Sequence, residues 1–145
     1  MTATIFKNKS TNWTKSDIPN LEGKTVFITG SNSGLGFFTA KALAEKNAHV
    51  VLACRTLKKA NTAIDKLKSL NPEGKFSALE LDLADLNNVC EIGSKFSNDF
   101  ENLDLLINNA GIMHPPKTLS AQGFEIQFAV NHLAHMLLTL KLLPL

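Results

Sequence analysis

The chain has 145 residues, of which 44% are hydrophobic and 19% are charged, and its formal net charge is +2. This length and composition are typical of one globular domain, and the chain is too short for two. The small net charge argues against a nucleic-acid-binding surface. The two cysteines and four histidines lack the spacing of a disulfide framework or a metal site, so we expect reduced thiols and no bound metal.

Residues 1–22 are predicted to form an irregular, polar N-terminal arm, which ends near the helix-breaking run Ile18-Pro19-Asn20. We expect Trp13 to anchor this arm against the domain. The arm contains no apolar run of the kind found in targeting signals, and no stretch approaches the roughly 18 apolar residues that a membrane span needs. The chain is therefore expected to be cytoplasmic, with a particular organelle left open.

Predicted strands and helices alternate from residue 23 onward. Short apolar runs bounded by Gly, Pro or polar residues predict strands over 24–29, 49–53, 76–81 and 103–107. Helices are predicted over 34–46, 56–70, 84–96 and 124–142, with a loop over 108–123. Short strand–helix–strand connections indicate right-handed crossovers. We predict an α/β fold, a Rossmann-type doubly wound parallel sheet of order 3-2-1-4, in an incomplete NAD(P)-binding domain over residues 23–145.

A glycine-rich turn joins the first predicted strand to the first predicted helix, and it reads Thr29-Gly30-Ser31-Asn32-Ser33-Gly34-Leu35-Gly36. Such a turn forms an anion site, because backbone N–H groups and the helix dipole face the ligand. Gly30 would permit the tight turn, Gly34 the approach of a pyrophosphate, and Gly36 the close packing of the helix on the sheet. The alternative is a tight turn that binds no ligand, and the neighbouring motifs are needed to distinguish the two interpretations.

The spacing T-G-x-x-x-G-x-G differs from the commoner G-x-G-x-x-G and resembles the cofactor motif of the short-chain dehydrogenase/reductase family. The loop Asn108-Asn109-Ala110-Gly111 resembles the second signature of that family, and Asp82 stands where the family places an aspartate on the adenine ring. The run over residues 128–135 is similar to the retinol-dehydrogenase-like branch. The resemblance covers about residues 21–145.

The resemblance implies a set of cofactor-binding residues in the turn and after the second, third and fourth strands. They are Gly30, Ser31, Asn32, Ser33, Gly34, Leu35, Gly36, Arg55, Asp82, Leu83, Asn109, Ala110 and Gly111. Purely structural roles are the alternatives for several residues of the family motifs. Asp82 could cap the next helix, Asn108 and Asn109 could bond backbone groups in a turn, and Asn131 could be an ordinary polar residue on a helix.

NADP is the predicted cofactor, and NAD is the less favoured one. Arg55 follows the second predicted strand, 19 residues after Gly36, where an acidic residue would favour NAD. A guanidinium can meet the 2′-phosphate of NADP with two parallel hydrogen bonds. Lys58 and Lys59 are expected to be solvated helix residues, and the alternative for Arg55 is a plain surface arginine.

The resemblance implies hydride transfer between the nicotinamide and a small carbonyl or alcohol substrate. Family members use a serine and a Tyr-x-x-x-Lys pair, in which the lysine lowers the pKa of the tyrosine that acts as general acid and base. Asn131 matches the family asparagine that helps to hold a proton-relay water. The chain contains no tyrosine. We therefore expect the cofactor-binding half of an NADP-dependent oxidoreductase, inactive alone. A non-catalytic NADP(H)-binding module and a non-functional truncated product are the alternatives.

An incomplete domain is expected to expose apolar surface. The fourth strand would be an uncovered edge, and the last helix would expose several of Phe124, Phe128, Leu133, Met136, Leu137 and Leu140. We expect weak cofactor binding, and either aggregation or a partner, such as a second copy docked through the last helix. Met113 and His114 would either lie at the near edge of the substrate pocket or pack within their loop.

Overall fold

The computed structural model of the chain describes residues 13–145. Residues 1–12 of the predicted arm lie outside this described part. The arm continues as the 3₁₀ helix η1 (Lys15–Asp17), which is tied to the domain by an ion pair between Lys15 and Glu45. The expectation that Trp13 anchors the arm is wrong, because its side chain is 72% exposed.

Four parallel strands form one sheet in the order β3-β2-β1-β4, which confirms the predicted topology. They are β1 (Thr25–Thr29), β2 (His49–Cys54), β3 (Lys75–Glu80) and β4 (Leu105–Ile107). Phe27 of β1 pairs with Val51 of β2 on one side and with Leu106 of β4 on the other. The edge strand β4 leaves Leu105 40% exposed, in agreement with the predicted uncovered edge.

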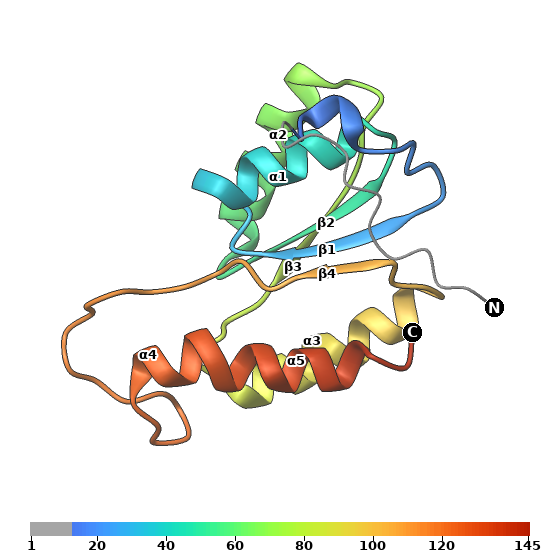
Figure 1. The fold of residues 1–145 in the computed structure, drawn as a ribbon. Coiled ribbons are helices and arrows are strands. Elements are labelled where there is room, and N and C mark those ends of the chain that lie inside the picture. Colours follow the sequence, from blue (N-terminus) through green and yellow to red (C-terminus); the bar gives the residue numbers. More distant parts are fainter. Residues whose placement is uncertain (1–12) are drawn as a thin grey trace.

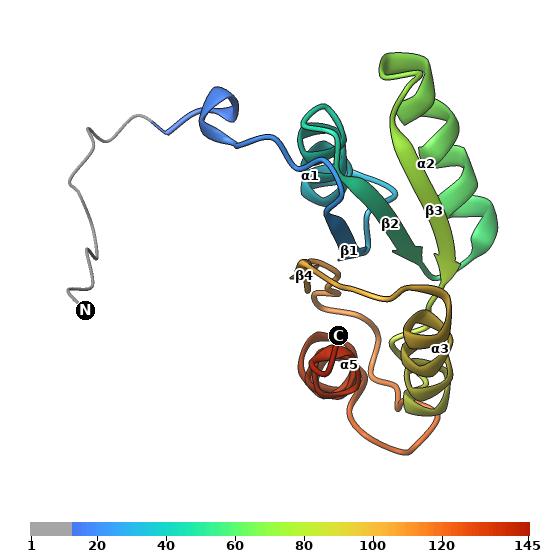
Figure 2. The same ribbon diagram turned by 90° about the vertical axis from the view of Figure 1, so that its right-hand side faces the viewer.

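Helices cover both faces of the sheet (Figures 1 and 2). They are α1 (Gly34–Ala44) and α2 (Leu57–Leu70) on one face, and α3 (Leu86–Asp99) and α5 (Ala134–Leu142) on the other. Successive strand residues alternate between the two layers, because Val26 and Ile28 pack with α1 and α2 whereas Phe27 packs with α3 and α5. Within residues 13–145, no helix is both long and apolar enough to cross a bilayer.

The predicted helix over 124–142 is three helical segments in series. It begins with α4 (Ile126–Phe128), continues through the π-helical turn η2 (Ala129–Leu133), and ends in α5. The helix begins at Ile126 because the Glu125 carboxylate accepts hydrogen bonds from the backbone N–H groups of Gln127 and Phe128. As expected, its apolar side chains are only partly covered, with Phe124, Phe128, Met136 and Leu140 exposed and Leu133 and Leu137 half-buried.

Close packing of α3 on α5 depends on a glycine. A Cβ atom added at Gly93 would lie 2.9 Å from the Cβ of Lys141, which is too close for two carbon atoms. Further along α3, Phe96 stacks on Phe100 with ring centroids 4.4 Å apart and meets Phe27 edge-on at 5.1 Å. The position of α5 over the sheet is therefore set by a small residue beside an aromatic cluster.

The variant Gly93→Val should lower the free energy of unfolding by about 1–3 kcal/mol, the usual cost of forcing extra methyl groups into a packed contact. Urea unfolding followed by far-UV circular dichroism measures this change. Ser94→Val is the matched control, because Ser94 is exposed on the same helix, and it should change stability by less than about 0.5 kcal/mol. Equal stability of the two variants would contradict the tight contact.

Candidate functional site

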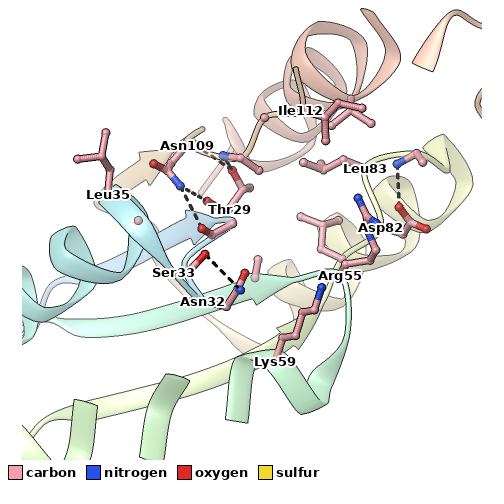
Figure 3. A pocket seen from close by; sticks show the side chains of 18 residues that line it. Thr29, Asn32, Ser33, Leu35, Arg55, Lys59, Asp82, Leu83, Asn109 and Ile112 are labelled. Atoms are coloured by element: carbon pink, nitrogen blue, oxygen red, sulfur yellow. Dashed lines mark hydrogen bonds between the residues drawn. The ribbon is translucent and has the colours of Figure 1, made fainter. Parts of the chain in front are cut away.

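A cavity of about 410 Å³ opens where the carboxyl ends of the strands meet (Figure 3). At this edge the strand order reverses, because β1 has β2 on one side and β4, which follows β3 in the chain, on the other; this is the usual position of a ligand in an open α/β sheet. Most of the residues predicted to bind a cofactor line it: Gly30, Asn32, Ser33, Leu35, Gly36, Arg55, Asp82, Leu83, Asn109, Ala110 and Gly111.

Three predicted site residues do not line the cavity. Ser31 is fully buried, and its hydroxyl donates to the carbonyl of Ile28 at 3.1 Å, so it stabilises the turn from inside. Gly34 adopts a φ of +55°, a left-handed conformation that side chains disfavour, and it shapes the turn without lining the cavity. Asn131 lies on the π-helical turn and acts through a neighbouring segment.

The glycine-rich turn is pressed against the loop that follows β4. A Cβ at Gly30 would lie 2.8 Å from the Cβ of Ala110, and one at Gly36 would lie 2.5 Å from the Nδ2 of Asn109 and 2.7 Å from the Gly30 carbonyl oxygen. Gly36 was expected to let the helix pack on the sheet. Its contacts are instead with the turn and the loop, so it lets these two backbone segments approach each other.

The N-terminus of α1 points its first N–H groups toward this cavity without a side-chain cap. Ser33 is the N-cap residue, yet within the described part of the chain its side chain makes no capping hydrogen bond. By contrast, the Thr56 side chain caps α2 and the Asp85 side chain caps α3. The uncapped end carries the positive end of the helix dipole and can accept an anionic group.

Thr29 and Asn109 hold the two loops together. The Nδ2 of Asn109 donates to the carbonyl oxygens of Thr29 at 2.9 Å and Gly30 at 3.2 Å. In return, the Thr29 hydroxyl oxygen accepts the backbone N–H groups of Asn109 and Ala110, both at 3.0 Å. The Asn109 side chain therefore bonds backbone groups, as the structural alternative proposed, while the residue also lines the cavity. Asn108 instead bonds the Thr139 hydroxyl of α5 at 3.0 Å.

Asn131 secures the next part of the same loop. Its Oδ1 accepts the backbone N–H of Ile112 at 2.9 Å, and its Nδ2 donates to the Ile112 carbonyl oxygen at 2.8 Å. Ile112 lines the cavity, so Asn131 positions a wall residue from outside. Both polar atoms of the Asn131 side chain therefore form hydrogen bonds with the backbone of Ile112, and these two bonds account for a polar residue at this position.

Two cationic side chains line the cavity, Arg55 after β2 and Lys59 in the first turn of α2 (Figure 3). Lys59 is exposed, as expected of a solvated helix residue, but it also lines the cavity. The Thr56 hydroxyl accepts the Lys59 backbone N–H at 3.3 Å, and this cap starts α2 so that Lys59 turns toward Arg55. The cavity therefore has a positive side next to the uncapped end of α1.

A further part of the cavity wall, next to Arg55, is largely apolar. Leu81, Leu83, Ile112 and Val130 line it, and a second hollow of about 360 Å³ continues from it past Pro115. Asp82 stands at this end, where its Oδ1 accepts the Ala84 backbone N–H at 2.9 Å. The alternative that Asp82 caps the next helix is wrong, because Asp85 is the N-cap of α3. An apolar slot with Asp82 and Arg55 at its rim suits a flat heteroaromatic ring.

Several other side chains that could have taken part in a site lie outside the cavity. Met113 is 80% exposed and His114 donates its backbone N–H to Gln127, and within residues 13–145 neither lines the cavity or its extension. Burial raises the pKa of the Cys54 thiol, so it stays neutral although its Sγ is 4.0 Å from the Ser31 hydroxyl. In the same described range, no three His, Cys, Asp or Glu side chains gather as metal ligands would.

Known proteins resemble this chain in sequence and in fold. The family model for short chain dehydrogenases matches residues 24–145. Human retinol dehydrogenase 13 is 43% identical over 129 residues, which are 89% of this chain and 38% of that protein. A crystal structure of a protein from Mycobacterium paratuberculosis superposes with a TM-score of 0.81 at 42% identity, over 92% of this chain and 47% of that one. The chain thus spans about two fifths of the length of the curated relative.

Solved relatives contain either nicotinamide nucleotide. L-Sorbose reductase from Gluconobacter frateurii, complexed with NADPH, has a TM-score of 0.72 at 25% identity, over 86% of this chain and 48% of that one. A D-mannonate oxidoreductase from Haemophilus influenza with bound NAD has a TM-score of 0.69 at 27% identity, over 87% and 51%. The matched family model, the sequence identity and the shared sheet together show that this chain belongs to the short-chain dehydrogenase family of oxidoreductases, which bind nicotinamide nucleotides.

Proposed function

We propose that this chain binds NADP(H) and forms the cofactor-binding part of an oxidoreductase that acts on a carbonyl or alcohol group of a small molecule. The observation that carries the proposal is the pairing of Arg55 and Lys59 in one cavity with the uncapped N-terminus of α1. No acidic residue stands at the end of β2, where a carboxylate would bond the ribose 2′-hydroxyl of NAD.

The residues present fit a dinucleotide along the whole cavity. The turn from Gly30 to Gly36 would hold the pyrophosphate, because its glycines keep side chains out of the path and the helix end supplies N–H donors. Arg55 and Lys59 would hold the 2′-phosphate with charge-assisted hydrogen bonds. Asp82 and Leu83 would lie against the adenine on one side, and Ile112 and Val130 on the other.

The bound nucleotide would supply the hydride, and the residues of this chain would orient it. Asn109, Ala110 and Gly111 line the cavity beside the turn and would support the nicotinamide end. Asn131 would act on the nucleotide indirectly, because its two side-chain hydrogen bonds hold the backbone of Ile112 in place. The family resemblance implies a tyrosine hydroxyl that protonates the carbonyl oxygen, and no tyrosine occurs among these 145 residues. We therefore propose binding and orientation as the roles of this chain.

Competition between two small nucleotides tests the proposed 2′-phosphate site. NADPH is bound to the chain, its fluorescence is followed, and adenosine 2′,5′-bisphosphate or adenosine 5′-monophosphate is added. We expect the bisphosphate to displace NADPH at least about tenfold more effectively, since only it carries the phosphate that Arg55 and Lys59 would bind. Equal displacement by the two nucleotides, or no NADPH binding, would contradict the proposal.

A non-catalytic nucleotide-binding module is a second candidate, favoured by the lack of tyrosine in the sequence. Both candidates require NADPH binding, and only turnover by the chain itself would exclude the module. Absorbance at the NADPH band is followed with the chain, NADPH and a panel of aldehydes and ketones. Oxidation of NADPH by the 145-residue chain would exclude the module and would require another acid in place of the tyrosine.

A further inference from the structure

A buried histidine on α5 connects the two halves of the site. His135 is only 7% exposed, and its ring lies between β1 and the π-helical turn η2. Its Nε2 is 3.0 Å from the Thr29 hydroxyl oxygen, and its Nδ1 is 3.3 Å from the Asn131 carbonyl oxygen. His135 lines neither hollow of the site, so it does not meet the cofactor itself.

The Thr29 hydroxyl determines which ring nitrogen of His135 carries the proton. A hydroxyl has one proton to donate and two lone pairs to accept with. The backbone N–H groups of Asn109 and Ala110 occupy both lone pairs of Thr29 at 3.0 Å. The hydroxyl proton is then left for Nε2 of His135, since the other acceptor in reach, the Ile107 carbonyl oxygen, is 3.5 Å away.

The hydrogen bond on the other side of the His135 ring independently indicates that Nδ1 carries the proton. The Asn131 carbonyl oxygen can only accept, so the Nδ1 that faces it has to carry a proton to form a hydrogen bond. Burial also lowers the pKa of the His135 imidazole, against the opposing effect of its bond to Asn131, and this favours the uncharged ring. The imidazole is thus an acceptor toward Thr29 and a donor toward Asn131.

We propose that His135 is a positioning residue, which as a neutral ring protonated at Nδ1 fixes the Thr29 hydroxyl and thereby the loop Asn109–Gly111. With Nε2 as its acceptor, the hydroxyl keeps both lone pairs directed at the two loop amides. The same ring holds the carbonyl of Asn131, whose side chain clasps Ile112. One side chain therefore sets two consecutive segments of the cavity wall. The expected effect on NADP(H) rests on the proposed function.

The ring proton is measured directly in the ligand-free chain. Long-range proton–nitrogen NMR correlations distinguish a protonated from an unprotonated ring nitrogen, and the four histidines are assigned by comparing spectra of His132→Phe and His135→Phe. We expect the His135 signals at neutral pH to show an unprotonated Nε2 and a protonated Nδ1. Protonation at Nε2, or at both nitrogens, would overturn the proposal without reference to cofactor binding.

Two replacements of His135 separate hydrogen bonding from packing. His135→Phe keeps a planar ring without polar atoms, whereas the amide oxygen of His135→Gln can accept from the Thr29 hydroxyl. We expect His135→Phe to speed hydrogen exchange of the Asn109 and Ala110 amides and to weaken NADPH binding about tenfold, and His135→Gln to restore most of both. His132→Phe, on an exposed residue of the preceding turn, should change neither.

The outcomes are distinguishable from failure of the proposed function. If the chain does not bind NADPH, the ring tautomer and the exchange of the two amides still report on the network. Unchanged amide exchange in a folded His135→Phe variant would overturn the positioning role, and so would equal behaviour of the Phe and Gln variants. If His135→Phe does not fold, the tautomer in the unaltered chain decides.

Discussion

Replacing Arg55 by alanine should weaken NADPH binding by at least about tenfold and leave NADH binding within about twofold. The guanidinium lines the cavity beside Lys59, and a charge-assisted hydrogen bond to a phosphate contributes about 1.5–3 kcal/mol. NADH lacks the 2′-phosphate, so it has nothing to lose at this position. Dissociation constants of both nucleotides are measured by fluorescence titration of each variant.

Lysine variants on α2 serve as the comparison for Arg55. Lys59→Ala should weaken NADPH binding less than Arg55→Ala, because a lysine acts on a phosphate as a single point charge. Lys58→Ala removes the same charge from an exposed neighbour that does not line the cavity, and should have little effect. Equal losses of NADPH and NADH affinity in Arg55→Ala would remove the basis for assigning NADP.

Replacing Gly36 by valine should lower NADPH affinity by at least about 100-fold, since separating the turn from the loop would remove hydrogen bonds to the pyrophosphate, each of which contributes about 1.5–3 kcal/mol when one partner is charged. A Cβ at this position would lie 2.5 Å from Asn109 and 2.7 Å from the Gly30 carbonyl oxygen, so the turn and the loop would have to separate. Binding is measured by titration, and circular dichroism confirms that the variant is folded.

Thr39→Val is the matched control for Gly36→Val. It also places a valine in α1, but threonine and valine have the same branched shape and Thr39 does not line the cavity. This control should bind NADPH as the unaltered chain does. If Gly36→Val does not fold, Gly36→Ala adds only the clashing Cβ and should still weaken binding. A folded Gly36→Val with normal affinity would show that the turn is not the pyrophosphate site.

Much of the fold follows from hydrophobic patterning. The central strands β1 and β2 are short, almost wholly apolar runs that are buried on both faces, and such runs predict parallel strands joined by helices. The glycine-rich turn then locates the site, because only glycine allows the close approaches made at Gly30 and Gly36. These features are local in sequence, and this is why the strand order and most cavity-lining residues could be predicted.

Features that depend on tertiary placement could not be predicted. Lys59 is an exposed helix residue, and only the docking of α2 places it at the cavity. Trp13 reads as an anchor, yet within residues 13–145 it is 72% exposed. The bond between His135 and Thr29 joins residues 106 positions apart, and no sequence pattern around either residue indicates it. In each case the sequence gives the type of residue, but the side chains that it contacts depend on how distant segments pack together.

The π-helical turn η2 has a consequence for the rotational phase of the last helix. A π turn holds one more residue than an α turn, and one residue corresponds to about 100° of rotation around the axis. Val130, within η2, faces the cavity, whereas His135, after it, faces Thr29 of β1. Shortening η2 by one residue would turn the imidazole away from the sheet. The wider turn is what allows one helix to present a cavity wall and an internal hydrogen-bonding ring on the required sides.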